Sequence, residues 1–181
     1  MKLMIASDIH GSEYYCRLAL RAFENSGSDK LLLLGDLLYH GPRNDLPKEY
    51  NPKAVISMLN PIADKILAVR GNCEAEVDQM VLSFPVLADY ALIELREITI
   101  FATHGHLYNQ ENLPPMAKGT VLLNGHTHIP SCIEHENYVY MNPGSTSIPK
   151  EGSCHSYMIV ENREFKWLDL ESNKKYKTYK V

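Results

Sequence analysis

Residues 30–36 read "KLLLLGD", a continuous apolar run that ends in a glycine and a carboxylate. A run without polar alternation is typical of a short strand covered on both faces, as in a parallel sheet. The same pattern occurs at residues 2–7, "KLMIAS", and at residues 65–71, "KILAVRG". Helical patterns between the three runs predict a β-α-β-α-β order for the front half of the chain.

The connections in this half also have clear signals. Ser12 is a suitable cap for a helix over residues 13–25, and Pro52 suits the first turn of a helix over residues 52–59. Residues 37–51, "LLYHGPRNDLPKEYN", predict a long loop. Long loops in compact domains are often functional.

The back half of the chain predicts mostly strands, in the runs "ADYALIEL", "EITIFATHG", "TVLLNGHTH", "SCIEHENYVYMNPGS" and "HSYMIVENREFKWLDL". Hairpin turns are expected at Glu136-Asn137 and at Glu161-Asn162, and residues 172–181 predict an edge strand or a loose tail. The two halves together favour a layered α/β (α+β) fold. A length of 181 residues with 45% hydrophobic content suits a single domain over residues 1–181.

Composition argues against several classes of function. The net charge of -4 gives no broad basic surface, so general nucleic-acid binding and attraction to anionic membranes are not expected. The four cysteines include no C-x-x-C pair and are interpreted as reduced thiols. The start, "MKLMIASDIHG", has too short an apolar stretch for a signal sequence or a membrane span. A cytoplasmic protein is expected.

Side chains of metal-ligand type follow the apolar runs, where the predicted strands end. They are Asp8, His10, Asp36, Asn72, His104, His126 and His128. Each one alone has a turn or capping explanation. Because ligand sites form along the carboxyl ends of strands in α/β sheets, seven such residues in the same topological position predict one metal site.

The ligand types indicate the kind of ion and its number. Oxygen and nitrogen donors without thiolates suit Mn, Fe, Co, Ni or Zn better than Cu(I) or an iron-sulfur cluster. Seven ligands are too many for one tetrahedral ion. They suit two ions about 3.5 to 4 Å apart with a bridging carboxylate, an arrangement used for in-line attack at phosphorus.

The motifs D-x-H, G-D, G-N, H and G-H-x-H, in this order, resemble those of the calcineurin-like metallophosphoesterases. The stretches "ASDIHGS", "GDLLYHGPRN", "RGNCEAEVDQM" and "NPGSTSIPK" look like the YfcE group of small bacterial phosphodiesterases in that family. The resemblance covers essentially the whole chain. It implies a four-layered α-β-β-α sandwich, two Mn²⁺ ions, and hydrolysis of phosphate diesters by in-line attack of a metal-bridging hydroxide.

The resemblance also assigns roles to residues. It implies that one ion is held by Asp8, His10 and His128, the other by Asn72, His104 and His126, and that Asp36 bridges both. His106, two residues after a ligand, is a candidate hydrogen-bond donor or proton shuttle. His40 and Arg43, in the long loop, are candidates for contact with a substrate phosphate or its leaving group. The "NPGSTS" turn is expected to pack on the site.

Cys73 departs from the wider family pattern, because many members have G-N-H-[DE] where this chain has "GNCE". The missing histidine is usually taken as the group that assists the leaving oxygen. A cysteine phosphatase is excluded because the sixth residue after Cys73 is Gln79 and not arginine. Cys73 is either a small side chain beside the site or a weak donor to the leaving group.

Two functions of other classes remain as alternatives. One is an interaction scaffold on the same fold, as in the retromer subunit, although that role does not require a full ligand set. The other is a binuclear C-N hydrolase, although those sites are rich in aspartate and this set is rich in imidazole. A small-molecule phosphate diester is the expected substrate, and a homo-oligomer is compatible with the sequence.

Overall fold

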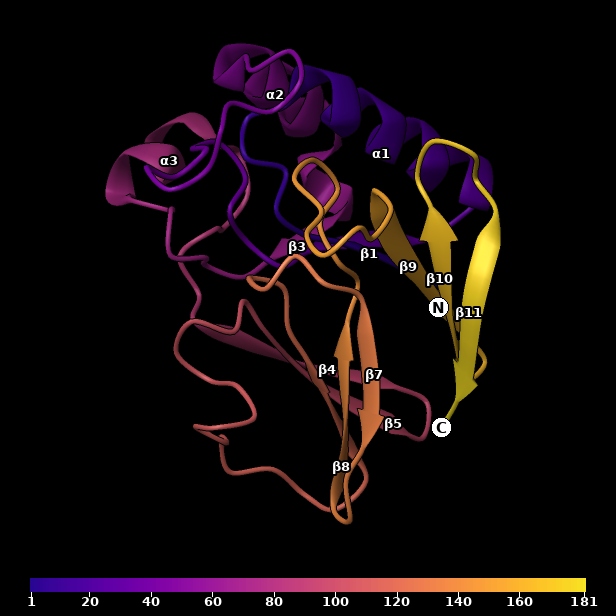
Figure 1. Ribbon diagram of the computed structural model, residues 1–181. Helices are drawn as coiled ribbons and strands as arrows, with labels where there is room; N and C mark the ends of the chain where they lie inside the picture. The colour runs from indigo at the N-terminus through magenta and orange to yellow at the C-terminus, as the bar shows by residue number, and fades with distance from the viewer.

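Two β-sheets packed face to face form the centre of the structure, a computed structural model that describes residues 1–181 (Figure 1). The first sheet has the order β11-β10-β9-β1-β2-β3. Its strands are β1 (Leu3–Ala6), β2 (Lys30–Leu33), β3 (Ile66–Ala68), β9 (Ser156–Glu161), β10 (Glu164–Asp169) and β11 (Lys175–Lys180). β1, β2 and β3 are parallel, as the apolar runs predict, and β9 is antiparallel to β1. The carboxyl ends of the three parallel strands therefore share one edge.

The second sheet has the order β4-β5-β6-β8-β7. Its strands are β4 (Tyr90–Leu95), β5 (Ile98–Thr103), β6 (Thr120–Leu123), β7 (Ser131–Glu134) and β8 (Tyr138–Asn142). β5, β6 and β8 run parallel, whereas β4 and β7 pair antiparallel with their neighbours. Both sheets are thus mixed.

The alternation of side chains along β1 separates two hydrophobic cores. Leu3 and Ile5 pack between the sheets, while Met4 and Ala6 pack against the helices. The core between the sheets also contains the fully buried Trp167, whose Nε1 donates a hydrogen bond of 2.7 Å to the carbonyl of Asn142 in the second sheet.

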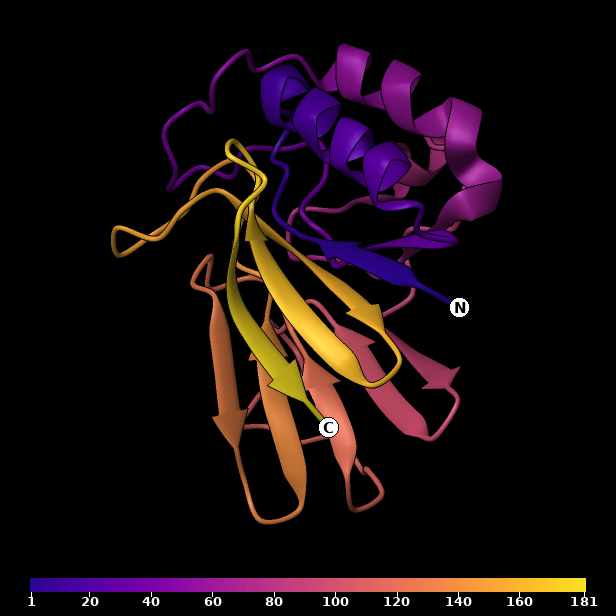
Figure 2. The same cartoon turned by 90° about the vertical axis from the view of Figure 1, so that its right-hand side faces the viewer.

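The helices lie on the outer side of the first sheet (Figure 2). They are α1 (Glu13–Ser26), α2 (Pro52–Leu59), the 3₁₀ helix η1 (Asn60–Lys65) and α3 (Glu76–Val81). The predicted cap is present, since Ser12 Oγ accepts a hydrogen bond of 3.2 Å from the backbone N–H of Tyr15. No helix combines the length and the apolar character that a membrane crossing requires.

The outer face of the second sheet has no helix over it (Figure 2). Its buried side chains, Phe101, Leu122 and Tyr140, are instead packed against Tyr108 and Met116 of the loop between β5 and β6. The two central sheets and the helical layer agree with the predicted sandwich. The fourth layer of this chain is made of loop rather than helix.

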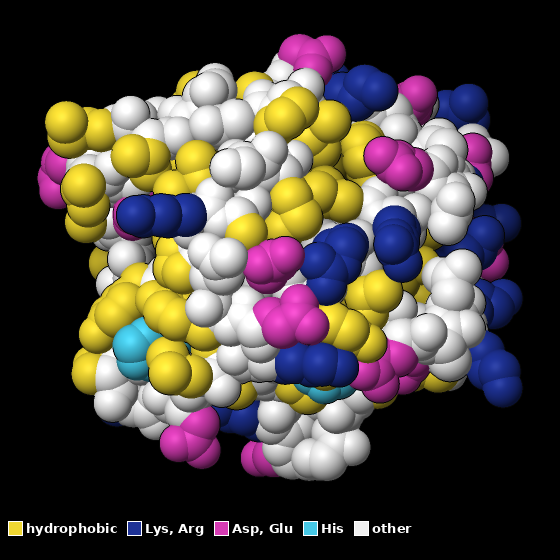
Figure 3. Space-filling view, turned by 90° about the horizontal axis from the view of Figure 1, so that it is seen from above, with side chains coloured by type: hydrophobic (Ala, Val, Ile, Leu, Met, Phe, Trp, Pro, Cys, Tyr) yellow, Lys and Arg dark blue, Asp and Glu magenta, His cyan; other side chains and the backbone are white.

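The two predicted hairpins and the C-terminal tail can be compared with the structure. The turn at Glu136-Asn137 is confirmed, but the next hairpin turns one residue later than predicted, at Asn162-Arg163, where both φ angles are positive. The tail is an edge strand, β11. Figure 3 shows Lys and Arg side chains gathered along the margin on the side of β11, and lysines on an edge strand discourage pairing with other chains.

Candidate metal centre

The ends of five strands bring the seven predicted ligand residues together. The loops after β1, β2 and β3 come from the first sheet, and those after β5 and β6 come from the second. The first two loops run side by side, because the backbone N–H groups of Asp8 and His10 donate to the carbonyls of Gly35 (3.1 Å) and Asp36 (2.8 Å). The convergence predicted from the strand ends is present in the structure.

Gly35 and Gly71 let the second and third loops touch. Gly35 has a φ of +90°, and a Cβ there would collide with the backbone nitrogen of Gly71. A Cβ on Gly71 would collide with the carboxylate of Asp36. Glycine is therefore needed at both positions for Asp36 and Asn72 to lie close together.

Left-handed backbone is concentrated at the predicted ligands. φ is positive at Asp8 (58°), His10 (48°), Asp36 (54°), His126 (66°) and His128 (62°). For residues other than glycine this conformation costs about 1–2 kcal/mol each. Strain of this kind accumulates at ligand and active sites, where the surrounding structure enforces it.

The first set of predicted ligands, Asp8, His10 and His128, is buried. His128 Nε2 lies 3.3 Å from both Asp8 Oδ1 and His10 Nε2, and His10 Nε2 lies 3.7 Å from Asp8 Oδ1. The three side chains are 0 to 3% exposed. Burial opposes ionisation of Asp8, but the adjacent His10 and His128 side chains outweigh it and hold the pKa of Asp8 well below its usual range.

The second set, Asn72, His104 and His126, is more open. His104 Nε2 lies 3.1 Å from Asn72 Oδ1 and 3.2 Å from His126 Nδ1. His104 is buried, but His126 is half-buried and Asn72 is exposed. This set contains no carboxylate of its own.

Asp36 lies between the two sets and faces both. Its Oδ2 lies 3.6 Å from His10 Nε2, and its Oδ1 lies 3.5 Å from His104 Nε2. Burial lowers the pKa of His104, but its hydrogen bond with the Asp36 carboxylate prevails and raises that pKa to about 9. A cation would compete with this proton, since ligation requires neutral imidazole.

The hydrogen bonds of the imidazoles leave one nitrogen of each ring directed into the cluster. Nδ1 of His10, His104 and His128 lies 2.6 to 2.7 Å from the backbone carbonyls of Tyr39, Leu34 and Ile148, respectively. In the neutral ring this bond fixes the proton on Nδ1 and the lone pair on Nε2. Asp8 Oδ1 is also buried without a hydrogen-bond partner. A cation bound among these facing acceptors would satisfy them together.

The donor set fits two divalent ions. Atoms bound at about 2.1 Å to one ion stand about 3.0 to 3.4 Å apart, depending on the coordination geometry. The separations within each set, 3.1 to 3.7 Å, are close to this range. Clusters that could hold a metal include Asp8 with His10 and His128, and Asp8 with Asp36 and His104.

The "NPGSTS" turn holds the loop that carries Asp8, as the sequence predicts. Three hydroxyls donate to the backbone carbonyl of Asp8, namely Ser145 Oγ (2.9 Å), Thr146 Oγ1 (3.3 Å) and Ser147 Oγ (2.9 Å). Thr146 also donates its backbone N–H to the carbonyl of Ser7 at 3.0 Å. These hydrogen bonds hold Asp8 in its left-handed conformation.

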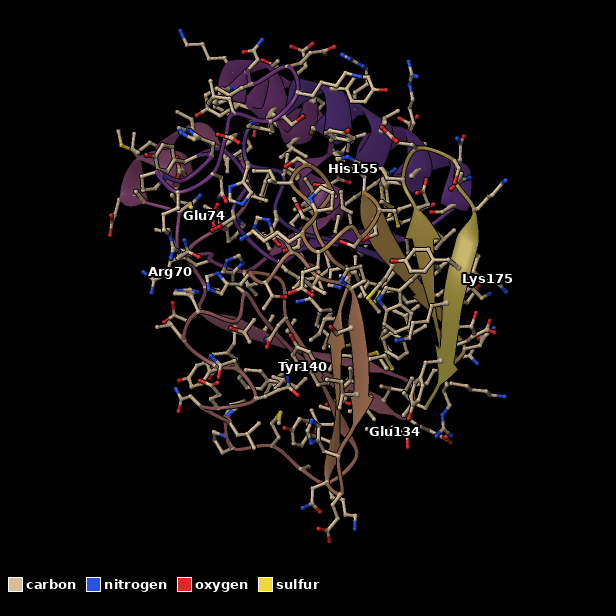
Figure 4. All side chains as sticks on the ribbon, viewed as in Figure 1. Arg70, Glu74, Glu134, Tyr140, His155 and Lys175 are labelled. Atoms are coloured by element: carbon tan, nitrogen blue, oxygen red, sulfur yellow. The ribbon has the colours of Figure 1, made fainter.

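Glu74 links the loops that carry Asp36 and Asn72, and the sequence analysis did not single it out. Its carboxylate accepts backbone hydrogen bonds from Gly71 (2.5 Å), Asp36 (2.8 Å) and Leu37 (2.7 Å). Figure 4 shows Glu74 just below α3, beside these strand ends. Burial and the Asp36 charge raise the pKa of Glu74 to about 7. In the sequence, Glu74 has the position of an acidic residue near the start of a helix, so no local pattern predicts that it joins the two loops.

Cys73 lies at the wall of a cleft of about 430 Å³ beside the cluster. Its backbone N–H donates to Asp36 Oδ1 at 2.9 Å, and its Sγ accepts from Asn72 Nδ2 at 3.3 Å. Burial and the nearby Asp36 carboxylate raise the pKa of the Cys73 thiol. A raised pKa disfavours the thiolate form that nucleophilic cysteines use.

The structure separates the three remaining candidates. Arg43 lines the cleft, whereas the ring of His40 packs edge-on against Tyr39 and Tyr50 and does not line it. His106 lies behind the second set, with its ring centroid 5.5 Å from that of His104. Burial, followed by the nearby His104, lowers the pKa of His106 to about 4.

A sandwich of two mixed sheets with Asp and His residues converging at the strand ends is the metallophosphoesterase fold. The calcineurin-like phosphoesterase superfamily domain matches residues 1–164, and the chain belongs to this superfamily. The family and fold predicted from the motifs are confirmed.

Relatives within the superfamily are known. Phosphodiesterase YfcE of Escherichia coli strain K12 is 49% identical over 162 residues, which are 90% of this chain and 88% of that protein. The solved structure of the E. coli phosphoesterase Yfce matches all of both chains with a TM-score of 0.97 and 44% identity. Vacuolar protein sorting 29 of Cryptosporidium parvum has a TM-score of 0.66 at 15% identity over 99% of this chain and 98% of its own, a likeness of fold alone.

Proposed function

We propose that this chain is a cytoplasmic phosphodiesterase that uses two divalent metal ions, with Mn²⁺ as the expected ion. The cluster of acceptor atoms carries the proposal, because two sets of donors share one carboxylate, Asp36. The 49% identity to phosphodiesterase YfcE supports the preference for diesters.

The proposed ligands are Asp8, His10 and His128 for one ion, Asn72, His104 and His126 for the other, and Asp36 for both. When bound, the two ions supply an ionised water at neutral pH and polarise the phosphoryl oxygens. The carbonyls bonded to Nδ1 of three of the imidazoles orient those rings, and Glu74 fixes Asp36 against Asn72. The protein thus provides a preorganised site that need not rearrange during the reaction.

Residues around the cleft act on the substrate in this proposal. Arg43 contacts the substrate, because its cationic side chain lines the cleft. Cys73 is a weak hydrogen-bond donor beside the leaving group, so esters with good leaving groups react fastest. His106 packs beside His104 and shields the second set.

The two other functions have less support. A scaffold does not need strained backbone at five ligand positions, and the solved Vps29 structures resemble this chain in fold alone. A C-N hydrolase would be expected to have mainly carboxylate ligands, whereas this cluster has four imidazoles and one amide.

The direct test is hydrolysis by protein stripped of metal and then reconstituted with Mn²⁺. Bis(p-nitrophenyl) phosphate should be cleaved faster than p-nitrophenyl phosphate, and only with added metal. Asp36→Asn and His128→Ala should each lose most of this activity. Absence of activity with every divalent ion tried, or wild-type rates in both variants, would overturn the proposal.

A further inference from the structure

Most residues that line the cleft beside the cluster are polar. Of its 11 lining residues only Pro42 and Cys73 have apolar side chains, and Asp36 is the one acid. A volume of about 430 Å³ suits a small ligand, and pockets for apolar or aromatic groups normally have apolar walls. The cleft thus offers little to an acyl chain or a nucleobase.

Two cations in this lining, Arg43 and Lys150, form no ion pair with any carboxylate of the protein. All five arginines and lysines that do form ion pairs lie outside the cleft, such as Arg17 with Glu13 and Glu49. Unpaired cations in a cleft attract anionic ligands. Their charge is available for a substrate.

The protein backbone ties each cation to a different part of the cluster. Lys150 donates its backbone N–H to the carbonyl of His128 at 3.3 Å, and Ser153 closes the Lys150 turn with two hydrogen bonds to its carbonyl. The turn that carries Arg43 begins at Gly41, where a Cβ would lie 3.5 Å from Cys73 Sγ. Lys150 is thus bonded to His128 of the first set, and the turn that carries Arg43 lies beside Cys73, next to Asn72 of the second set.

We propose that Arg43 and Lys150 form a subsite for a second anionic group on the substrate, such as a carboxylate or another phosphate. The inference rests on the proposed phosphodiesterase function. The scissile phosphate lies at the Asp and His cluster, and the ester arm that stays on phosphorus carries the second negative charge into the cleft. Lys150 and Arg43 then determine specificity for anionic over neutral diesters.

The test compares two diesters that share the p-nitrophenolate leaving group. One has a 2-carboxyethyl arm and the other the neutral, isosteric 2-carbamoylethyl arm. With Mn²⁺-loaded wild-type protein, kcat/KM should favour the carboxylate by about tenfold, since each exposed charge pair is worth up to about fivefold. The preference should arise mainly in KM, because the remote group binds equally in the ground and transition states.

Variants of Arg43 and Lys150 test whether these two residues cause the preference for the carboxylate diester. Arg43→Gln and Lys150→Gln should each reduce the carboxylate-to-amide ratio several-fold, the double variant should bring it near one, and Lys150→Arg should restore it. Lys53→Gln, an exposed lysine on α2, is the matched control and should leave the ratio unchanged. Calorimetry should show the same order for phosphonoacetate against methylphosphonate.

The outcomes separate the two proposals. If neither diester is hydrolysed, the phosphodiesterase function fails. If wild-type protein hydrolyses both with equal kcat/KM, the function stands and the anionic subsite is overturned. If Lys150→Gln and Arg43→Gln slow both diesters by the same factor, the cations hold the scissile phosphate instead, which also overturns the inference.

Discussion

The two ligand sets differ in charge and in access to solvent. The first set contains a buried carboxylate, Asp8, and side chains that are 0 to 3% exposed. The second set has the neutral amide of Asn72 in the corresponding place and opens to the cleft through Asn72 and His126, whereas the first set lines the cleft through His128 alone. Since charge count governs affinity for hard cations, the first set should bind an ion more tightly and the second should face the substrate.

The largest effect is expected from His10→Ala in the first set. The change removes a ligand and leaves Asp8 with one fewer partner, so activity on a p-nitrophenyl diester should fall on the order of 10³-fold, as several kcal/mol of charge stabilisation are lost. His135→Ala, an exposed histidine at the β7–β8 turn, is the control and should retain full activity. Comparable rates in the two variants would contradict the assignment of the first set.

His126→Ala tests the asymmetry between the sets. Titration of metal-free wild-type protein with Mn²⁺ in a calorimeter should give two classes of site. The variant should weaken the weaker class by at least about 10–100-fold and leave the tighter one. Loss of the tighter class instead would reverse the proposed order of affinity.

Glu74→Gln tests the connection between the loops that carry Asp36 and Asn72. The amide keeps the size of the side chain but has only one oxygen for three backbone donors, so the free energy of unfolding should fall by about 1–3 kcal/mol. Thermal unfolding measures this change. Glu111→Gln, at an exposed position, should have no effect, and an unchanged melting temperature for Glu74→Gln would contradict the proposed link.

Cys73→His tests the open side of the site. The imidazole would donate to the leaving oxygen more strongly than a thiol, so hydrolysis of alkyl diesters should rise by about tenfold or more while p-nitrophenyl diesters change little. The Mn²⁺ stoichiometry should not change. Unaltered alkyl-ester rates would mean that Cys73 is only a small side chain beside the site.

The smallest effect is expected from Thr146→Val behind Asp8. The change removes a hydroxyl that the carbonyls of Ser7 and Asp8 share, and both carbonyls keep other donors, so stability should fall by about 1 kcal/mol or less. Thr178→Val, at an exposed position on β11, serves for comparison. A loss of several kcal/mol would give this turn a larger structural role than its hydrogen bonds indicate.

The sequence predicted the strands and their terminal residues because both depend on short-range patterns. "KLLLLGD" and "KILAVRG" have the apolar runs of buried parallel strands, and Asp36 and Asn72 follow them directly. The same rule located His104 and His126 after strands of the second sheet. The order of the motifs along the chain then indicated the family.

Features that depend on long-range contacts were not predicted. No local pattern around Lys150 predicts a role for it, because its position beside His128 depends on a backbone hydrogen bond between two separate loops. Glu74 was missed for the same reason. Packing also decides that the loop before β6, and not a helix, covers the second sheet.

The most direct test of the central claim is a crystal structure of the Mn²⁺-loaded protein with anomalous difference maps at the manganese edge. The account predicts two peaks, one contacting Asp8, His10 and His128 and the other Asn72, His104 and His126, with Asp36 contacting both. A single peak, or two peaks that do not share Asp36, would contradict it.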